Sequence, residues 1–266
     1  MDVGKEREKI CRFFKAGVFS LSLVLLAGCT IRYVPKALET WKEVSEEGKF
    51  PIECVACKEK KVALSFEVKG TDKDVEEILS ILDREKIKAT FFVTGDWVKQ
   101  YPQEVQVISR TGSDIGNSSE SHRRMSGMSS GDCIEEVLGL HKQIRELTGT
   151  EMKLFRAPYG DYSETLIHSL DSLGYYPIEG NIDSLDWKDY GKDAIINEIC
   201  NNKDLKEGSI IKLHTGTKFT EKALNTVIDN LQKKGYQLVR VSDIVLSDYY
   251  IIDREGCQKS KVDYDK

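Results

Sequence analysis

Polar side chains follow several short apolar runs of the chain, at the places where strands are expected to end. Glu67 follows the run 62–66, and Arg156, Asp186 and His214 come after later runs. A carboxylate, an arginine, an aspartate and a histidine gathered at one edge of a fold are the parts of an acid–base site. We therefore take Glu67, Arg156, Asp186 and His214 as candidate catalytic residues.

Short apolar strands alternate with amphipathic helices along the chain, and these elements would position the four side chains. Repeated strand–helix units predict an α/β fold with a parallel sheet and helices outside it. Six or seven such units suit a closed or nearly closed barrel, whose chemistry gathers at the carboxyl ends of the strands. From periodicity and turn residues we expect strands at 62–66, 89–93, 114–117, 154–155, 175–178, 209–213 and 237–241, and helices at 72–86, 105–110, 134–147, 163–173, 194–200 and 220–233.

The composition is that of a globular protein. The chain has 266 residues, of which 40% are hydrophobic and 31% charged, which suits one large domain with a hydrophobic core. Its formal net charge is −5, and no concentrated Lys/Arg cluster is present. Because nucleic-acid binding needs such a basic face, we expect no nucleic-acid partner.

The first 28 residues differ from the rest of the chain. A basic lead-in precedes 16–28, a run without charge that is too short to span a membrane and is typical of a signal peptide. The run ends in Leu26-Ala27-Gly28-Cys29, which resembles a lipobox, and Cys29 is then the lipidated residue. The alternative is an uncleaved N-terminal anchor. Both interpretations place the protein outside the cytoplasm, attached to the membrane, with a polar tether over 29–59.

Several segments together are similar to the polysaccharide deacetylase family, also called the NodB homology domain or carbohydrate esterase family 4. The sequence resembles the family motifs at 88–93, 114–117, 156–160 (RAPYG), 183–187 (DSLDW) and 210–214 (IIKLH). The resemblance covers 60–248 and leaves 249–266 as a tail. It implies a single domain folded as a distorted (β/α)7-type barrel. The most similar subgroup is associated with sporulation and with cell-wall peptidoglycan.

The resemblance implies removal of acetyl groups from an N-acetylated glycan by hydrolysis of the acetamide C–N bond. In the family, an aspartate and two histidines hold a divalent metal, usually zinc or cobalt, which activates water. Carried over to this chain, Glu67 takes the position of the general base, where the family has Asp. Arg156 would keep that carboxylate ionised. His214 would protonate the leaving amine, and Asp186 would stabilise the His214 imidazolium.

The resemblance also implies substrate-binding residues. Trp187 would wall the acetyl pocket, and the backbone amide of Tyr159 would face the oxyanion. Lys212 stands where the family has an apolar residue lining that pocket. It would point the same way as His214, because side chains alternate along a strand. We hypothesise that Lys212 replaces the metal's positive charge by pairing with Glu67 or Asp186, and the alternative is that it extends to the surface.

The metal positions depart from the family pattern. Val68 and Ser118 stand at two of the three ligand positions, and only His122 remains. A catalytic zinc normally has three protein ligands, so one imidazole is too weak a site. Glu120 or Asp114 could replace the missing ligands if either reaches the site. The resemblance therefore implies a divalent metal as cofactor, and the alternative is that this chain binds none.

Three functions remain after these observations. The first is a deacetylase acting on peptidoglycan or a related glycan, and the second is an impaired, non-metal-binding relative that serves as a glycan- or wall-binding lipoprotein. The acid–base residues favour the first, and the substituted ligands favour the second. The third is a thiol redox protein using Cys54 and Cys57, although a lone CxxC is a weak signal. A local disulfide or two idle thiols explains that pair better.

Overall fold

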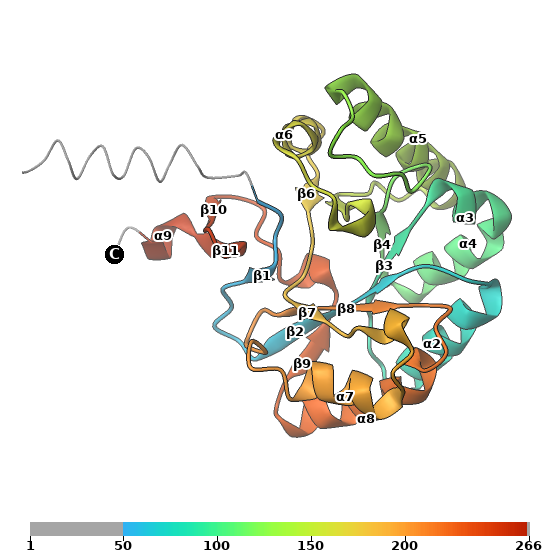
Figure 1. Cartoon of the computed structure of the whole chain (residues 1–266), viewed down its shortest axis with the longest axis vertical. Helices are drawn as coiled ribbons and strands as arrows, with labels where there is room; N and C mark the ends of the chain where they lie inside the picture. Colours follow the sequence, from blue (N-terminus) through green and yellow to red (C-terminus); the bar gives the residue numbers. More distant parts are fainter. Residues whose placement is uncertain (1–49, 265–266) are drawn as a thin grey trace, which may run out of the picture. The chain divides into compact units, whose positions relative to one another are not determined.

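The structure, a computed structural model, describes residues 50–264 and is built on a curved sheet whose strand pairings are all parallel (Figure 1). The strand order is β6-β5-β4-β3-β2-β8-β7, and β9 pairs with the first residues of β2. This confirms the expected barrel-type α/β architecture. The strands are β2 (Lys61–Glu67), β3 (Thr90–Val93), β4 (Asp114–Asn117), β5 (Leu154–Phe155), β6 (Tyr176–Pro177), β7 (Ile182–Asp183), β8 (Ile210–His214) and β9 (Gln237–Val239).

Helices follow most strands and cover the outer side of the sheet (Figure 1). In α2 the Asp74 carboxylate accepts a hydrogen bond from the Thr71 backbone N–H at 2.7 Å, and Val75, Ile78 and Leu82 are buried. An N-terminal cap and one apolar stripe therefore fix this helix against the sheet. The helices are α2 (Asp72–Arg84), α3 (Gly95–Gln100), α4 (Pro102–Thr111), α5 (Ser130–Thr148), α6 (Glu164–Ser172), α7 (Lys192–Cys200), α8 (Thr220–Lys233) and α9 (Lys261–Tyr264).

Strand β7, which follows β6 directly, is not among the strands predicted from the sequence. Strand β6 continues into β7 through 178–181 without a helix between them. No helix within 50–264 is long and apolar enough to cross a membrane. The expected signal peptide and Cys29 lie outside the described residues.

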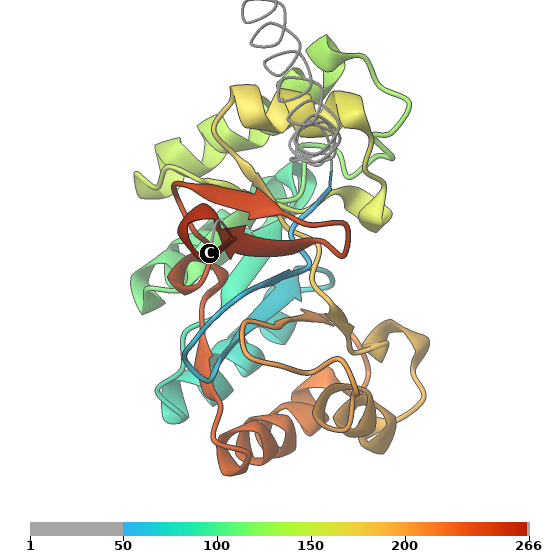
Figure 2. The same cartoon turned by 90° about the vertical axis from the view of Figure 1, so that its left-hand side faces the viewer.

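The expected tether ends at 59 and the expected tail begins at 249, but residues on both sides of the domain are folded. Strands β1 (Cys54–Val55), β11 (Cys257–Ser260) and β10 (Tyr250–Ile252) form a separate three-stranded sheet, visible as red arrows beside the blue N-terminal segment in Figure 2. Ile52 is fully buried, and its backbone N–H donates to the Pro177 carbonyl at 2.7 Å. Residues 50–59 and 250–260 therefore belong to the domain, because their apolar side chains complete its core.

We predict that Ile52→Ala lowers the free energy of unfolding by about 2–4 kcal/mol, since it leaves a cavity in a packed core. Phe50→Ala is the matched control, because Phe50 is 37% exposed and its removal should cost little. Urea unfolding followed by circular dichroism measures both. Equal stabilities of the two variants would contradict the placement of this segment in the fold.

Candidate functional site

The carboxyl ends of the sheet strands surround a groove of about 490 Å³. The structure brings together six of the residues that the sequence singled out, and Asp186 lies directly behind one of them. The groove is lined by Glu67, Lys69, Arg156, Ala157, Tyr159, Gly160, Glu179, Asp183, Trp187, Lys212 and His214. The strand-end rule therefore correctly predicts that these side chains lie together.

His214 is held by Asp186 at two points. Its Nδ1 is 2.7 Å from Asp186 Oδ1, and its backbone N–H donates to Asp186 Oδ2 at 2.7 Å. Thr220 Oγ1 donates to the same Oδ2 at 2.5 Å, so the fully buried carboxylate has several partners. Burial alone would lower the pKa of His214, but hydrogen bonds with Asp186 and Glu67 outweigh it and raise the pKa to about 9. The imidazole is therefore protonated at neutral pH and is a proton donor.

Glu67 faces two imidazoles and an ammonium group. Its Oε1 is 3.1 Å from His122 Nε2 and 3.3 Å from Lys69 Nζ, and its Oε2 is 3.5 Å from His214 Nε2. Burial would raise the pKa of Glu67, but these partners hold it well below its usual range. A general base is most effective when its pKa lies near the working pH. The carboxylate is consequently ionised but weakly basic.

Arg156 lies beneath the groove and is 2% exposed. Its Nη2 donates to Ser65 Oγ at 2.8 Å, and its guanidinium carbon lies 4.1 Å from the centre of the Phe92 ring. Its charge acts on both Glu179 and Glu67, and the larger effect comes from Glu179. The contacts that keep Glu67 ionised therefore come from His122, His214 and Lys69, with Arg156 contributing from a distance.

The two altered ligand positions cannot supply metal donors. Val68 is 2% exposed and packs in the hydrophobic core, and fully buried Ser118 donates its hydroxyl to the Arg156 carbonyl at 3.1 Å. Within residues 50–264 no cluster of three His, Cys, Asp or Glu side chains could hold a metal ion. The residues present therefore do not fit the divalent metal implied by the resemblance, and His122 is a hydrogen-bonding partner of Glu67 instead.

The two carboxylates considered as substitutes are engaged elsewhere. Glu120 pairs with Lys99 and accepts a hydrogen bond from Gln143 at 2.5 Å. Asp114 begins β4 and therefore lies at the opposite end of the sheet, where its Oδ1 accepts from Ser242 Oγ at 2.8 Å. Neither carboxylate reaches the metal position.

Lys212 points toward the groove, as expected, but its partners differ from the hypothesis. Its Nζ lies 2.5 Å from Glu179 Oε1 and 3.9 Å from Asp183 Oδ2. The hypothesis that Lys212 pairs with Glu67 or Asp186 is wrong, because a nearer carboxylate at the end of β6 takes the ammonium group. The groove is therefore lined by the Lys212–Glu179 ion pair, whereas the resemblance implies an apolar residue at position 212.

Two exposed aromatic residues form the mouth of the groove. Tyr159 and Trp187 are 61% and 54% exposed. The centroids of the Tyr159 and His122 rings are 5.0 Å apart. The guanidinium carbon of Arg124 also lies 5.0 Å from the Tyr159 centroid. Exposed aromatic rings beside polar groups offer flat surfaces for a sugar ring. The roles expected for the Tyr159 amide and the Trp187 ring stay predictions.

Four residues of the site escaped the sequence analysis. Lys69 and Glu179 line the groove directly, whereas Ser65 and Thr220 support Arg156 and Asp186. Ser65 precedes Glu67 by two positions on β2, so the alternation of a strand would have put both on one face. Glu179 follows β6, and the strand-end rule applied to it would have identified it.

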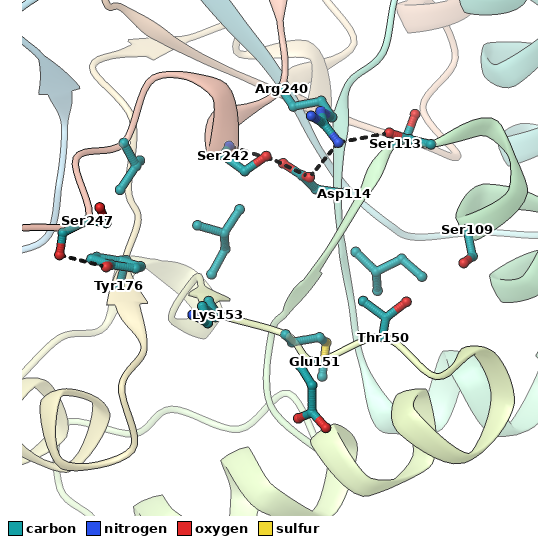
Figure 3. Close-up of a pocket in the computed structure, with 15 residues that line it drawn as sticks. Ser109, Ser113, Asp114, Thr150, Glu151, Lys153, Tyr176, Arg240, Ser242 and Ser247 are labelled. Carbon is teal, nitrogen blue, oxygen red and sulfur yellow. Dashed lines mark hydrogen bonds and ion pairs between the residues drawn. The ribbon is translucent and has the colours of Figure 1, made fainter.

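A second pocket, of about 410 Å³, lies at the amino-terminal ends of β4, β5 and β6 (Figure 3). Its upper edge in the figure is a network in which Arg240 contacts Asp114 and Ser242 donates to Asp114. Arg240 also donates to the Gly112 carbonyl at 3.1 Å and pairs with Asp243. These charges are already paired, and this end of a barrel usually serves stability, so we assign the network a structural role.

We predict that the His214 ring titrates with a midpoint near pH 9 in NMR spectra of 13C-labelled protein. In Asp186→Asn the midpoint should fall toward 6.5, whereas Asp183→Asn, a groove carboxylate that does not contact His214, is the matched control. Because the folded-state pKa exceeds the unfolded value of 6.5, the stabilisation is fully present below pH 6.5 and is lost as the pH rises through 9. A wild-type midpoint at or below 6.5 would exclude the assigned pairing.

Comparison with curated proteins identifies relatives of similar length. The chain is 31% identical over 221 residues to an uncharacterised 30.6 kDa protein of Geobacillus stearothermophilus, an alignment that covers 80% of each chain. It is 29% identical over 192 residues to the peptidoglycan-N-acetylmuramic acid deacetylase PdaA of Bacillus subtilis, covering 71% of this chain and 72% of that one.

Solved structures share the fold. A CE4 family pseudoenzyme of Bacillus anthracis superposes with a TM-score of 0.70 at 26% identity, covering 75% of this chain and 70% of that one. A mutant of it, described as having restored enzymatic activity, gives 0.71 over 75% and 72%. The sequence pattern of the polysaccharide deacetylase family matches residues 55–178. With the strand-end groove, the His214–Asp186 pair and these relatives in agreement, the chain belongs to the polysaccharide deacetylase family.

Proposed function

We propose that the groove binds an N-acetylated glycan of the bacterial cell wall, peptidoglycan or a related polymer. The relatives named as peptidoglycan deacetylases support this substrate class. The groove supports it physically, because Tyr159 and Trp187 offer exposed ring surfaces beside charged side chains. Hydrolysis of the acetamide C–N bond is the reaction for which the acid–base groups of the family are arranged.

The single observation that carries the chemistry is the chain of contacts Asp186–His214–Glu67. Asp186 orients and stabilises the His214 imidazolium, which can give a proton to a departing sugar amine. Glu67 is ionised, and in the proposed reaction it receives a proton from water. Its pKa, held low by three cationic or hydrogen-bonding partners, limits that step.

The structure favours a second candidate, an impaired family member that binds glycan without hydrolysing it. The observation behind it is the burial of Val68 and Ser118 at the positions of two metal ligands. Of the three positions at which the resemblance places ligands for zinc or cobalt, only His122 keeps a metal-binding side chain. The structural similarity to a CE4 family pseudoenzyme supports this candidate.

We predict that Val68→Asp combined with Ser118→His lets the full chain bind one zinc or cobalt ion and raises acetate release from N-acetylated chitooligosaccharide or peptidoglycan on the order of a hundredfold or more. The added carboxylate and imidazole would complete a three-residue donor set with His122. Metal content is measured by elemental analysis, and acetate by an enzymatic assay. Adding Glu67→Gln to this variant is the matched control, which should keep the metal and lose the acetate release.

The same samples separate the two candidates. A wild-type chain that releases acetate as fast as the double variant rules out the impaired candidate. A double variant that is folded by circular dichroism and binds metal, yet releases no acetate from either substrate, rules out the deacetylase reaction. Sedimentation of the wild type with peptidoglycan sacculi then tests whether it binds the wall, and loss of co-sedimentation in Trp187→Ala places the binding in the groove.

We further propose that the protein is a lipoprotein held outside the cytoplasm through Cys29. The apolar run 16–28 and the Leu26-Ala27-Gly28-Cys29 sequence support this location. We predict that a bacterium producing the chain incorporates radiolabelled palmitate into it, and that Cys29→Ser abolishes the label while Cys11→Ser leaves it unchanged. Labelling that survives Cys29→Ser would refute lipidation at this residue.

A further inference from the structure

Two cysteines lie side by side in the small sheet outside the barrel. Strands β1 and β11 are parallel neighbours whose register pairs Cys54 with Cys257, and both residues are buried. Neighbouring strands are about 4.8 Å apart. A disulfide needs its Cα atoms about 4.4–6.8 Å apart, with both Cβ atoms on the same side. Residues in register on neighbouring strands meet both requirements.

The two thiols affect each other's ionisation, and the charge of Lys206 acts on both. The interaction with Cys257 and the charge of Lys206 outweigh burial and lower the pKa of Cys54 to about 7. A thiolate is the form that attacks disulfides, but both thiols are buried in the folded chain, so an external oxidant reaches them as the chain folds.

The CxxC spacing at 54–57 does not describe a redox motif. The backbone continues in an extended form beyond β1, because the Ala56 N–H donates to the Gln258 carbonyl at 2.8 Å. In an extended chain, residues three positions apart are separated by roughly 10 Å and point to opposite sides. The extended backbone at 54–56 does not fold the two cysteines toward each other, and both thiols are free, which argues against both the local disulfide and the thiol redox function.

We propose that Cys54 and Cys257 form a structural disulfide in an oxidising environment. As the chain folds and before both thiols are buried, the Cys54 thiolate attacks an external disulfide, such as oxidised glutathione, forming a mixed disulfide and releasing one thiolate. Cys257 loses its proton to solvent and attacks Cys54 Sγ, and the second thiolate leaves. Two protein thiols are oxidised, and one external disulfide is reduced to two thiols. Formation in the cell rests on the proposed extracytoplasmic location, whereas the geometry does not.

The bond would secure the segment that completes the barrel wall. The Ile52 carbonyl accepts a hydrogen bond from the Glu179 N–H, and the Glu53 carbonyl accepts one from the Asn181 N–H, both at 2.9 Å. Residues 52–53 thus support the link between β6 and β7, which carries the carboxylate that pairs with Lys212 in the groove. A disulfide at 54 would fasten this support to the C-terminal strands and enclose most of the folded chain in one covalent loop.

The test uses the purified full chain, unfolded in reductant and refolded in buffers of oxidised and reduced glutathione. We expect an intact mass lower by about 2 Da per disulfide and a tryptic cross-link between the peptides holding Cys54 and Cys257. The melting temperature Tm should be higher than that of the reduced chain by roughly 5–15 °C, because the closed loop is long. Cys54→Ala and Cys257→Ala should each remove the reductant-sensitive part of Tm.

Cys57→Ala and Cys133→Ala are the matched controls and should keep the cross-link and the Tm difference. Mapping of a Cys54–Cys57 bond, or alkylation of both Cys54 and Cys257 after oxidative refolding, would overturn the proposal. So would a Tm difference that Cys257→Ala leaves intact. If either single variant fails to fold, the peptide map of the wild type decides alone. Alkylation in intact cells tests the compartment: free thiols there, with a cross-link in vitro, refute the location and not the geometry.

Discussion

The parallel pairing of β2 with β8 sets the geometry on which the groove depends. It places Glu67 in register with His214 at the carboxyl ends of two neighbouring central strands. Both strands are buried along most of their length, so the two side chains cannot separate without breaking the ladder. Asp186 then holds the imidazole through both ring and backbone. The acid–base arrangement therefore follows from strand register, and the surrounding loops only complete it.

The strand-end rule explains how much of the site was predictable. Glu67, Arg156 and His214 each follow an apolar strand directly, so their positions could be predicted without knowing any contact. The partner of Lys212 could not, because carboxylates follow or end β2, β6 and β7, and only the fold decides which of them is nearest. The small sheet was also out of reach, since β1 and β11 are separated by the whole barrel and two- to four-residue strands give no periodicity.

Electrostatics explains why the groove keeps its charge without a metal donor set. The His214 imidazolium lies between Asp186 and Glu67, while Lys69 pairs with Glu67 and His122 shares a hydrogen bond with it. Glu67, Asp186 and His214 each have an oppositely charged partner, which avoids the large penalty of an isolated ion. The same pairing that stabilises the Glu67 carboxylate weakens it as a base. Stability and catalytic power are therefore opposed at this residue.

The altered ligand positions and the retained charged residues have different explanations, fold stability for the first and ligand binding for the second. An apolar Val68 in the core stabilises the fold by roughly 1–2 kcal/mol through burial, and an aspartate there would need a metal to offset its desolvation. Stability alone can thus account for Val68. Stability does not account for the buried Arg156, which has two unpartnered guanidinium nitrogens, or for the Asp186–His214 pair. Apolar side chains of similar volume would stabilise the fold as well or better. The presence of these charged residues is best explained by a polar ligand that the groove still binds.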